Sequence, residues 1–128
     1  MNVNHRYVLD FARRFAAESD DPGLKILDFG CGGGAVVRAA LEEGLDIRGA
    51  DLFQEHASDR SGASRSGLLG SRIFEIRDGQ LPWPAEYFGL VVSNQVFEHV
   101  KDLGALVREI HRCSSRAARC WQSSLTFT

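Results

Sequence analysis

The 128-residue sequence has little of what marks several large classes of protein. Its three cysteines, Cys31, Cys113 and Cys120, are odd in number and widely spaced, which fits neither a disulfide framework nor a CxxC metal site. We therefore expect reduced thiols and no metal. No apolar run approaches the roughly 18 residues that a membrane-spanning helix needs, and the first residues lack the apolar core of a signal peptide. These features predict a cytoplasmic protein that does not enter a membrane.

The sequence also has no large excess of charge of either sign. The formal net charge is −2, which gives no overall attraction to a phosphate backbone, so we do not expect a nucleic acid as partner. Three prolines and thirteen glycines fall short of a low-complexity composition, and 44% hydrophobic with 25% charged residues is ordinary for a globular protein. The length is enough for about one domain.

The order of the apolar segments predicts alternating helices and strands. An amphipathic pattern over residues 4–18 predicts a helix, and the apolar run 24–29 predicts a buried parallel strand before a glycine-rich turn. The remaining predicted elements are a helix over 35–43, strands over 45–50, 72–77 and 88–93, a weak helix and a mobile loop over 54–70, and a helix from 103 to about 113. This alternation predicts an α/β fold whose ligands bind at the carboxyl ends of parallel strands.

Residues 26–34 read Ile-Leu-Asp-Phe-Gly-Cys-Gly-Gly-Gly, a strand that runs directly into glycines. Glycine lets the backbone turn tightly and approach a ligand without an intervening side chain. Gly30, Gly32 and Ala35 fit the dinucleotide fingerprint GxGxxG/A, and Asp51, nineteen positions after Gly32 (51 − 32), fits its ribose-binding acid. These residues alone leave open an NAD-type Rossmann binding module.

Asp28 stands at the end of the predicted strand, beside this loop. A carboxylate there would repel a pyrophosphate seated on the following helix N-terminus, and it would suit a cationic ligand. S-adenosylmethionine carries a sulfonium and an ammonium group and no phosphate, so electrostatics favour it over NAD. The alternative interpretation is a carboxylate that only accepts hydrogen bonds from the loop amides.

Four segments resemble, in order and spacing, the class I S-adenosylmethionine-dependent methyltransferases, in particular the type 11 family. The segments are LDFGCGGG at 27–34, GADL at 49–52, DGQLPW at 78–83 and the stretch 88–100. The resemblance covers roughly residues 20–112. It implies a three-layer, Rossmann-like parallel sheet with flanking helices, and methyl transfer from S-adenosylmethionine to a small-molecule acceptor.

The resemblance also implies which residues bind the cofactor. Asp51 would hold the two ribose hydroxyls, Asp78 would accept a hydrogen bond from the adenine amino group, and Asn94 would face the transferred methyl. The complete set is Asp28, Gly30, Cys31, Gly32, Asp51, Leu52, Asp78, Gly79 and Asn94. Methyl transfer from a sulfonium needs mainly in-line positioning, and His99 is more often structural on such a turn, so no catalytic residue is assigned.

Three side chains near these motifs have interpretations of their own. Trp83 either stacks on adenine or packs against the turn around it, and both interpretations are open. Cys31 fits a small buried loop residue better than a redox group. Gly89 stands where the family usually has an aspartate that supports the strand start, so we expect a structural cost there without a change of cofactor.

Residues 113–128 depart from the family pattern. The family continues with Val-Leu-Lys-Pro-Gly-Gly and an apolar fifth strand, whereas residues 113–121 read Cys-Ser-Ser-Arg-Ala-Ala-Arg-Cys-Trp. With suitable codons, a frame that starts one base earlier encodes the missing motif, so we hypothesise a reading-frame shift near codon 112. We accordingly divide the chain into an N-terminal helix at 1–19, a cofactor-binding core at 20–112 and an atypical tail. We expect the C-terminal strands of the fold to be missing, which leaves an inactive truncated methyltransferase fragment as an alternative.

Overall fold

The computed structural model of the chain describes residues 1–53, 57–94 and 101–122. Its helices are α1 (Val3–Glu18), α2 (Ala35–Glu42), α3 (Ala57–Arg65) and α4 (Leu103–Arg112), and its strands are β1 (Ile26–Phe29), β2 (Ile47–Asp51), β3 (Ile73–Glu75), β4 (Phe88–Ser93) and β5 (Ser114–Gln122). The four predicted helices and the four predicted strands are confirmed, with bounds that differ by a few residues. None of the helices in the described ranges is long and apolar enough to cross a bilayer.

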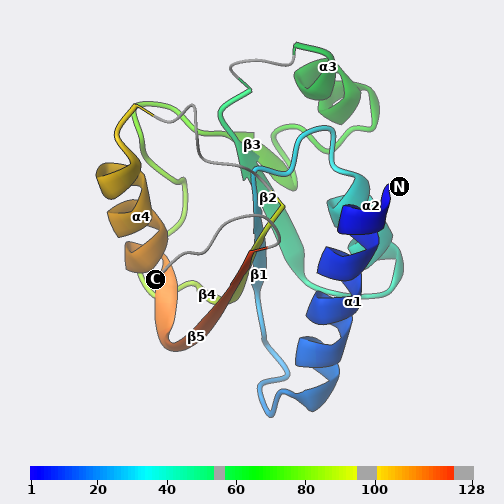
Figure 1. Ribbon diagram of the computed structural model, residues 1–128, viewed down its shortest axis with the longest axis vertical. Coiled ribbons are helices and arrows are strands. Elements are labelled where there is room, and N and C mark those ends of the chain that lie inside the picture. Colours follow the sequence, from blue (N-terminus) through cyan, green and yellow to red (C-terminus); the bar gives the residue numbers. More distant parts are fainter. Residues whose placement is uncertain (54–56, 95–100, 123–128) are drawn as a thin grey trace.

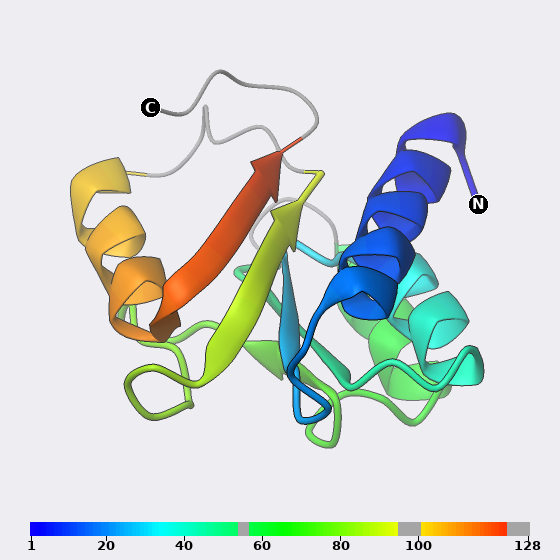
Figure 2. The same cartoon turned by 90° about the horizontal axis from the view of Figure 1, so that it is seen from below.

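The five strands form one parallel sheet in the order β3-β2-β1-β4-β5. Helices α1, α2 and α3 cover one face of this sheet, and α4 covers the other (Figures 1 and 2). This arrangement confirms the predicted three-layer α/β fold. Because all strands run the same way, their carboxyl ends meet at one edge of the sheet, where the predicted ligand site falls.

Consecutive strand residues point to opposite faces and supply two separate cores. Ile26 of β1 is fully buried in the first core, with Val8 and Ala12 of α1. The next residue, Leu27, is buried in the second core, with Leu106 of α4. A strand buried on both faces reads as a continuous apolar run, which is why the sequence pattern located β1 correctly.

Trp83 belongs to the second core. It is 8% exposed, and its ring makes edge-to-face contacts with Phe74 and Phe88 at centroid distances of 5.4 and 5.0 Å. These are favourable aromatic geometries. The structure therefore favours the packing interpretation of Trp83 over a stacking role on a ligand.

Gly89, the position that departs from the family pattern, lies near the start of β4. Its amide donates a hydrogen bond to the Lys25 carbonyl at 2.9 Å. A Cβ added to Gly89 would lie 2.6 Å from Cδ1 of Leu24. Leu24 thus fills the space that a side chain at this position would need.

The tail corrects an expectation from the sequence, because it forms a fifth strand. β5 pairs in parallel with β4, from Phe88 opposite Ser114 to Ser93 opposite Gln122, with a register shift after Phe88. The expectation that β4 lacks this neighbour is therefore wrong. The physical reason is that ladder hydrogen bonds use backbone groups, which every residue of this proline-free tail supplies. The turn after α4 starts the pairing, since the Phe88 amide donates to the Cys113 carbonyl at 2.8 Å.

Candidate functional site

The glycine loop, residues 30–34, connects β1 to α2. Gly30, Gly32 and Gly34 have φ angles of 76°, 55° and 91°, a region that other residues rarely adopt. Gly34 is the N-cap of α2, and a Cβ on it would collide with Cδ1 of Ile73. The glycines therefore let the chain reverse at the carboxyl end of β1 and bring the start of α2 close to Ile73 of β3.

Asp51 is the last residue of β2 and is 8% exposed. Its Oδ2 accepts a hydrogen bond from the Gly32 amide at 2.8 Å, and its Oδ1 accepts one from the Phe53 amide at 2.9 Å. A carboxylate has about four acceptor positions. Two amides, one on each oxygen, thus leave each oxygen able to accept from a further donor. That is the arrangement a pair of vicinal hydroxyls requires.

Asp28 lies in β1, opposite Gly49 of β2 and Val92 of β4, and is 3% exposed. Burial, and after it the nearby negative charge of Asp51, raises the pKa of Asp28 to about 8. At neutral pH the carboxyl group is therefore mainly protonated. A cation placed beside it would favour the ionised form and lower this pKa again.

Asp59 brings a third carboxyl group to the loop, from the first turn of α3. A Cβ on Gly32 would lie 3.3 Å from Oδ2 of Asp59, so the Asp59 side chain lies over the glycine loop. We refer to Asp28, Asp51 and Asp59 as the acidic triad. Sequence reasoning missed Asp59 because its segment shows no clean helical periodicity, and an acid in a helix's first turn is common for electrostatic reasons alone.

Cys31 lies within the loop and is 9% exposed. A Cβ on Gly49 would lie only 2.6 Å from its Sγ, so the thiol packs directly on the backbone of β2. Burial, then the negative charges of the acidic triad, keeps the pKa of this thiol well above its usual value. A protonated, enclosed thiol is a weak nucleophile, so the structure favours the packing role of Cys31.

Asp78 and Gly79 form an exposed turn after β3. Their φ angles are 55° and 68°, and the Gln80 amide donates to the Arg77 carbonyl at 3.0 Å. Two left-handed central residues define a type I′ turn, for which Asp-Gly is a preferred sequence. The Ile76 amide donates to the Asp51 carbonyl at 2.8 Å, which ties this segment to the end of β2.

The two remaining candidates extend the same edge of the sheet. Leu52 follows Asp51, is partly buried and packs against the second core. Asn94 follows β4 and is half-buried. The structure thus places the nine predicted residues at, or just beyond, the carboxyl ends of β1 to β4. His99 lies outside the described residues.

Comparisons with known proteins agree with this geometry. A family model described as a methyltransferase domain matches residues 27–121, which includes most of β5. The chain is 33% identical over 117 residues to norajmaline N-methyltransferase of Rauvolfia serpentina, covering 87% of this chain and 40% of that protein. The chain therefore belongs to this family of class I S-adenosylmethionine-dependent methyltransferases. It spans about 40% of the length of that curated relative.

Solved structures share the fold at low sequence identity. Phosphoethanolamine N-methyltransferase 2 of Haemonchus contortus, in complex with S-adenosyl-L-methionine, has a TM-score of 0.59 and 24% identity, covering 90% of this chain and 27% of that one. Geranyl diphosphate methyltransferase, in complex with GPP and sinefungin, has a TM-score of 0.63 and 20% identity, covering 91% and 42%. The likeness extends over nearly the whole described chain.

Proposed function

We propose that this chain binds S-adenosylmethionine at the carboxyl ends of β1, β2 and β3 and transfers its methyl group to a small-molecule acceptor. The observation that carries the proposal is the acidic triad around the glycine loop, with carboxyl groups from β1, β2 and α3. The cofactor has a sulfonium and an ammonium group and no phosphate. Its positive charge is therefore complementary to the carboxylates of Asp51 and Asp59, and it would favour ionisation of the Asp28 carboxyl group as well.

The same triad argues against NAD. A dinucleotide places its pyrophosphate on the amides at the N-terminus of the helix that follows the glycines. In this chain, that position lies beside Asp51 and beneath Asp59. Two phosphate charges there would face like charges in a partly buried setting, which is costly. The Rossmann binding module is thus the weaker proposal.

Each candidate residue has a role that its position supports. Asp51 has a free acceptor direction on each oxygen for the two ribose hydroxyls. The exposed turn at Asp78 and Gly79, tied to the end of β2, would meet the adenine edge, with Leu52 on the ring face. Gly30, Cys31 and Gly32 let the loop backbone approach the methionine part, near Asp28, and Asn94 borders the methyl group from β4.

Methyl transfer from S-adenosylmethionine depends on the positions of the reacting groups more than on proton transfer. S-adenosylmethionine supplies an activated methyl group, which an acceptor attacks in line with the departing sulfur. The protein's contribution is to hold the cofactor by its ribose, adenine and ammonium groups, so that the methyl points toward the acceptor. Asp28 also changes its proton occupancy when a cation binds beside it. We assign no general base.

Small molecules are the proposed acceptors by analogy with related methyltransferases. Norajmaline, phosphoethanolamine and geranyl diphosphate, after which three of these enzymes are named, differ from one another in structure but are all small molecules. The acceptor atom therefore follows from parts of each enzyme that differ, whereas the cofactor follows from the shared sheet edge.

Titration calorimetry tests the proposal. We expect S-adenosylmethionine and S-adenosylhomocysteine to bind and NAD to bind far more weakly, measured on the same preparation at one ionic strength. Asp59→Asn is an informative variant, since removing one negative charge should reduce the difference in affinity between S-adenosylmethionine and NAD. Tighter binding of NAD by the unmodified chain would contradict the proposal. Transfer of labelled methyl to members of an acceptor panel then tests the reaction itself.

A further inference from the structure

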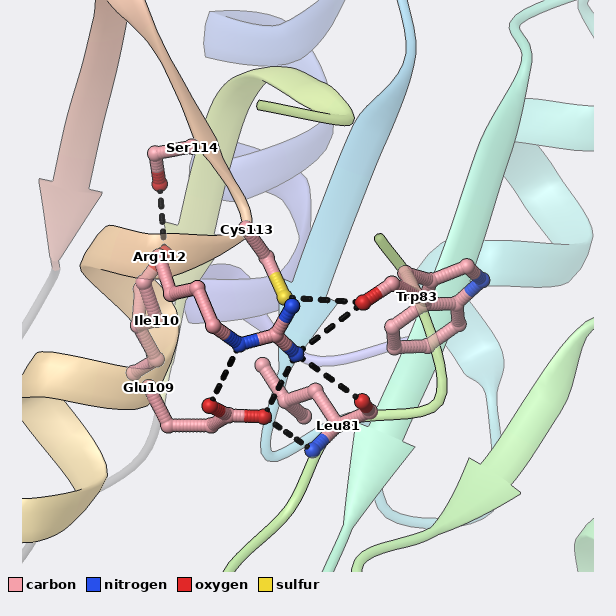
Figure 3. A network of polar contacts seen from close by, with 7 residues as sticks. All are labelled: Leu81, Trp83, Glu109, Ile110, Arg112, Cys113 and Ser114. Carbon is pink, nitrogen blue, oxygen red and sulfur yellow. Dashed lines mark hydrogen bonds and ion pairs between the residues drawn. The ribbon is translucent and has the colours of Figure 1, made fainter. Parts of the chain in front are cut away.

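The segment from Leu81 to Trp83, which follows the proposed adenine turn, is fastened to α4 by two charged side chains. The Leu81 amide donates to Oε2 of Glu109 at 2.7 Å. Nη2 of Arg112 donates to the carbonyl oxygens of Leu81 at 3.2 Å and of Trp83 at 3.0 Å (Figure 3). We call Glu109 and Arg112 the clasp.

The two clasp side chains also bind each other side by side. Nε of Arg112 donates to Oε1 of Glu109, and its Nη2 donates to Oε2, both at 2.7 Å. Their spacing of three residues on α4 places them on one helix face, and the Glu109 side chain is only 14% exposed. Hydrogen bonds to Arg112 and the Leu81 amide outweigh burial and keep the pKa of Glu109 below its usual value. The guanidinium of Arg112 and the carboxylate of Glu109 thus form a planar, doubly hydrogen-bonded pair, which a lysine in place of Arg112 cannot reproduce.

The clasp holds one side of the proposed adenine turn, and the end of β2 holds the other. On the β2 side, the Ile76 amide bonds to the Asp51 carbonyl. On the clasp side, Leu81 stands two residues after Gly79. The turn between these anchors is exposed and left-handed, so its position relative to Asp51 depends on both.

We propose that Glu109 and Arg112 are positioning residues for adenine recognition, because they fix the distance between the Asp78 turn and the ribose site at Asp51. This inference rests on the proposed function. The clasp does not touch the cofactor. It acts through the backbone of residues 81–83. Loss of the clasp lets the turn move away from the adenine edge, while Asp51 keeps the two hydrogen bonds that it accepts from backbone amides.

The chain offers a matched control in the pair Arg13 and Glu43. Nε and Nη2 of Arg13 donate to the two Glu43 oxygens at 2.6 and 2.9 Å, joining α1 to the end of α2. This pair has the same side-by-side chemistry as the clasp, and it holds helices on the opposite face of the sheet. Arg13→Met and Arg112→Met thus each remove a side-by-side Arg–Glu pair, and only Arg112→Met also removes the bonds to the carbonyls of Leu81 and Trp83.

The test compares affinity for S-adenosylhomocysteine with affinity for S-inosylhomocysteine, in which a carbonyl replaces the adenine amino group. The unmodified chain should prefer the adenine compound, since Asp78 accepts from the amino group. Arg112→Met should reduce that preference by roughly threefold to tenfold, the range of one hydrogen bond. Arg112→Lys should restore little of it, and Arg13→Met should leave it unchanged.

Hydrogen exchange of the ligand-free protein provides a second measurement. Arg112→Met and the milder Glu109→Gln should speed exchange of the Leu81 amide, while Arg13→Met should not. If exchange accelerates but the adenine preference of both clasp variants equals that of the unmodified chain, the positioning role is wrong although the proposed function stands. If the unmodified chain binds neither compound, both the proposed function and this inference are wrong.

Discussion

Asp28 gives the folded chain a pH dependence that can be derived from one residue. Its pKa rises from an ordinary value of 3.8 to about 8 because the carboxyl group is buried beside Asp51. Between these pH values the folded state keeps a proton that the unfolded chain has released. Stability therefore falls as pH rises from about 4 to about 8, since the folded state binds more protons there.

Asp28→Asn should remove that part of the pH dependence, because the amide has the same shape and cannot ionise. Urea denaturation at a series of pH values measures it, with exposed Asp20→Asn as the control. The Asp28 variant should gain stability relative to the unmodified chain as pH approaches 8. If the free energy of unfolding changed with pH in parallel for Asp28→Asn and the unmodified chain, ionisation of Asp28 would have no effect on stability.

Asp51→Ala should weaken cofactor binding by about 1–3 kcal/mol, the cost of leaving ligand hydroxyls without their charged acceptor. Calorimetry with S-adenosylhomocysteine gives the value. Asp46→Ala is the matched control, because Asp46 precedes the other end of β2 and forms ion pairs with Arg48 and Arg72. It should reduce stability without changing affinity. An unchanged dissociation constant for Asp51→Ala would place the ribose elsewhere.

At the scale of elements, the contact between the glycine loop and β3 depends on Gly34. Gly34→Ala would add a left-handed strain of roughly 1–2 kcal/mol and a collision with Cδ1 of Ile73, for which overpacking costs about 1–3 kcal/mol. Gly44 has a φ of 81°, and a Cβ added there would have no atom within 4 Å. Gly44→Ala should therefore show the backbone strain alone, without a collision.

Thermal or chemical unfolding of these variants separates the two costs. Combining Gly34→Ala with Ile73→Val removes the colliding methyl group and should recover part of the loss, beyond the effect of Ile73→Val by itself. Equal destabilisation by Gly34→Ala and Gly44→Ala would mean that α2 and β3 yield to the added methyl without cost.

Sequence reasoning found the strands that a local apolar pattern determines, and it missed the strand and the contacts that depend on distant residues. β1 and β4 were predictable because burial on both faces requires an apolar run, as in residues 88–93. β5 was not, because Ser-Ser-Arg-Ala-Ala-Arg carries no strand pattern and its conformation comes from pairing with β4. The clasp was also missed, since Glu109 and Arg112 bind backbone atoms of a segment 28 or more positions away, which leaves no local signal beyond their spacing.

At the scale of the whole molecule, β5 covers the edge of β4. A chain ending at residue 113 should be less stable and more prone to associate than one ending at 122, because β4 would present unpaired backbone groups. Melting curves and size-exclusion chromatography compare the two. Identical behaviour would mean that β5 contributes no stability in solution.

The origin of the tail is a separate prediction. We expect the DNA across codons 110–128 to encode Pro-Gly-Gly followed by an apolar run in the frame that begins one base earlier. Sequencing that segment decides the matter, independently of the pairing between β4 and β5. If the alternative frame lacks this pattern, the unusual composition of the tail is native.

The hold of Gly32 and Phe53 on Asp51 has a consequence for the kinetics of ligand capture. Two backbone amides fix the orientation of this carboxylate before any ligand arrives, so its rotational freedom is already lost in the folded state. Association then requires little reordering at the ribose end, and the entropy of binding is correspondingly less unfavourable. Substitutions that remove contacts to the ribose should shorten the residence time of the cofactor more than they slow its arrival.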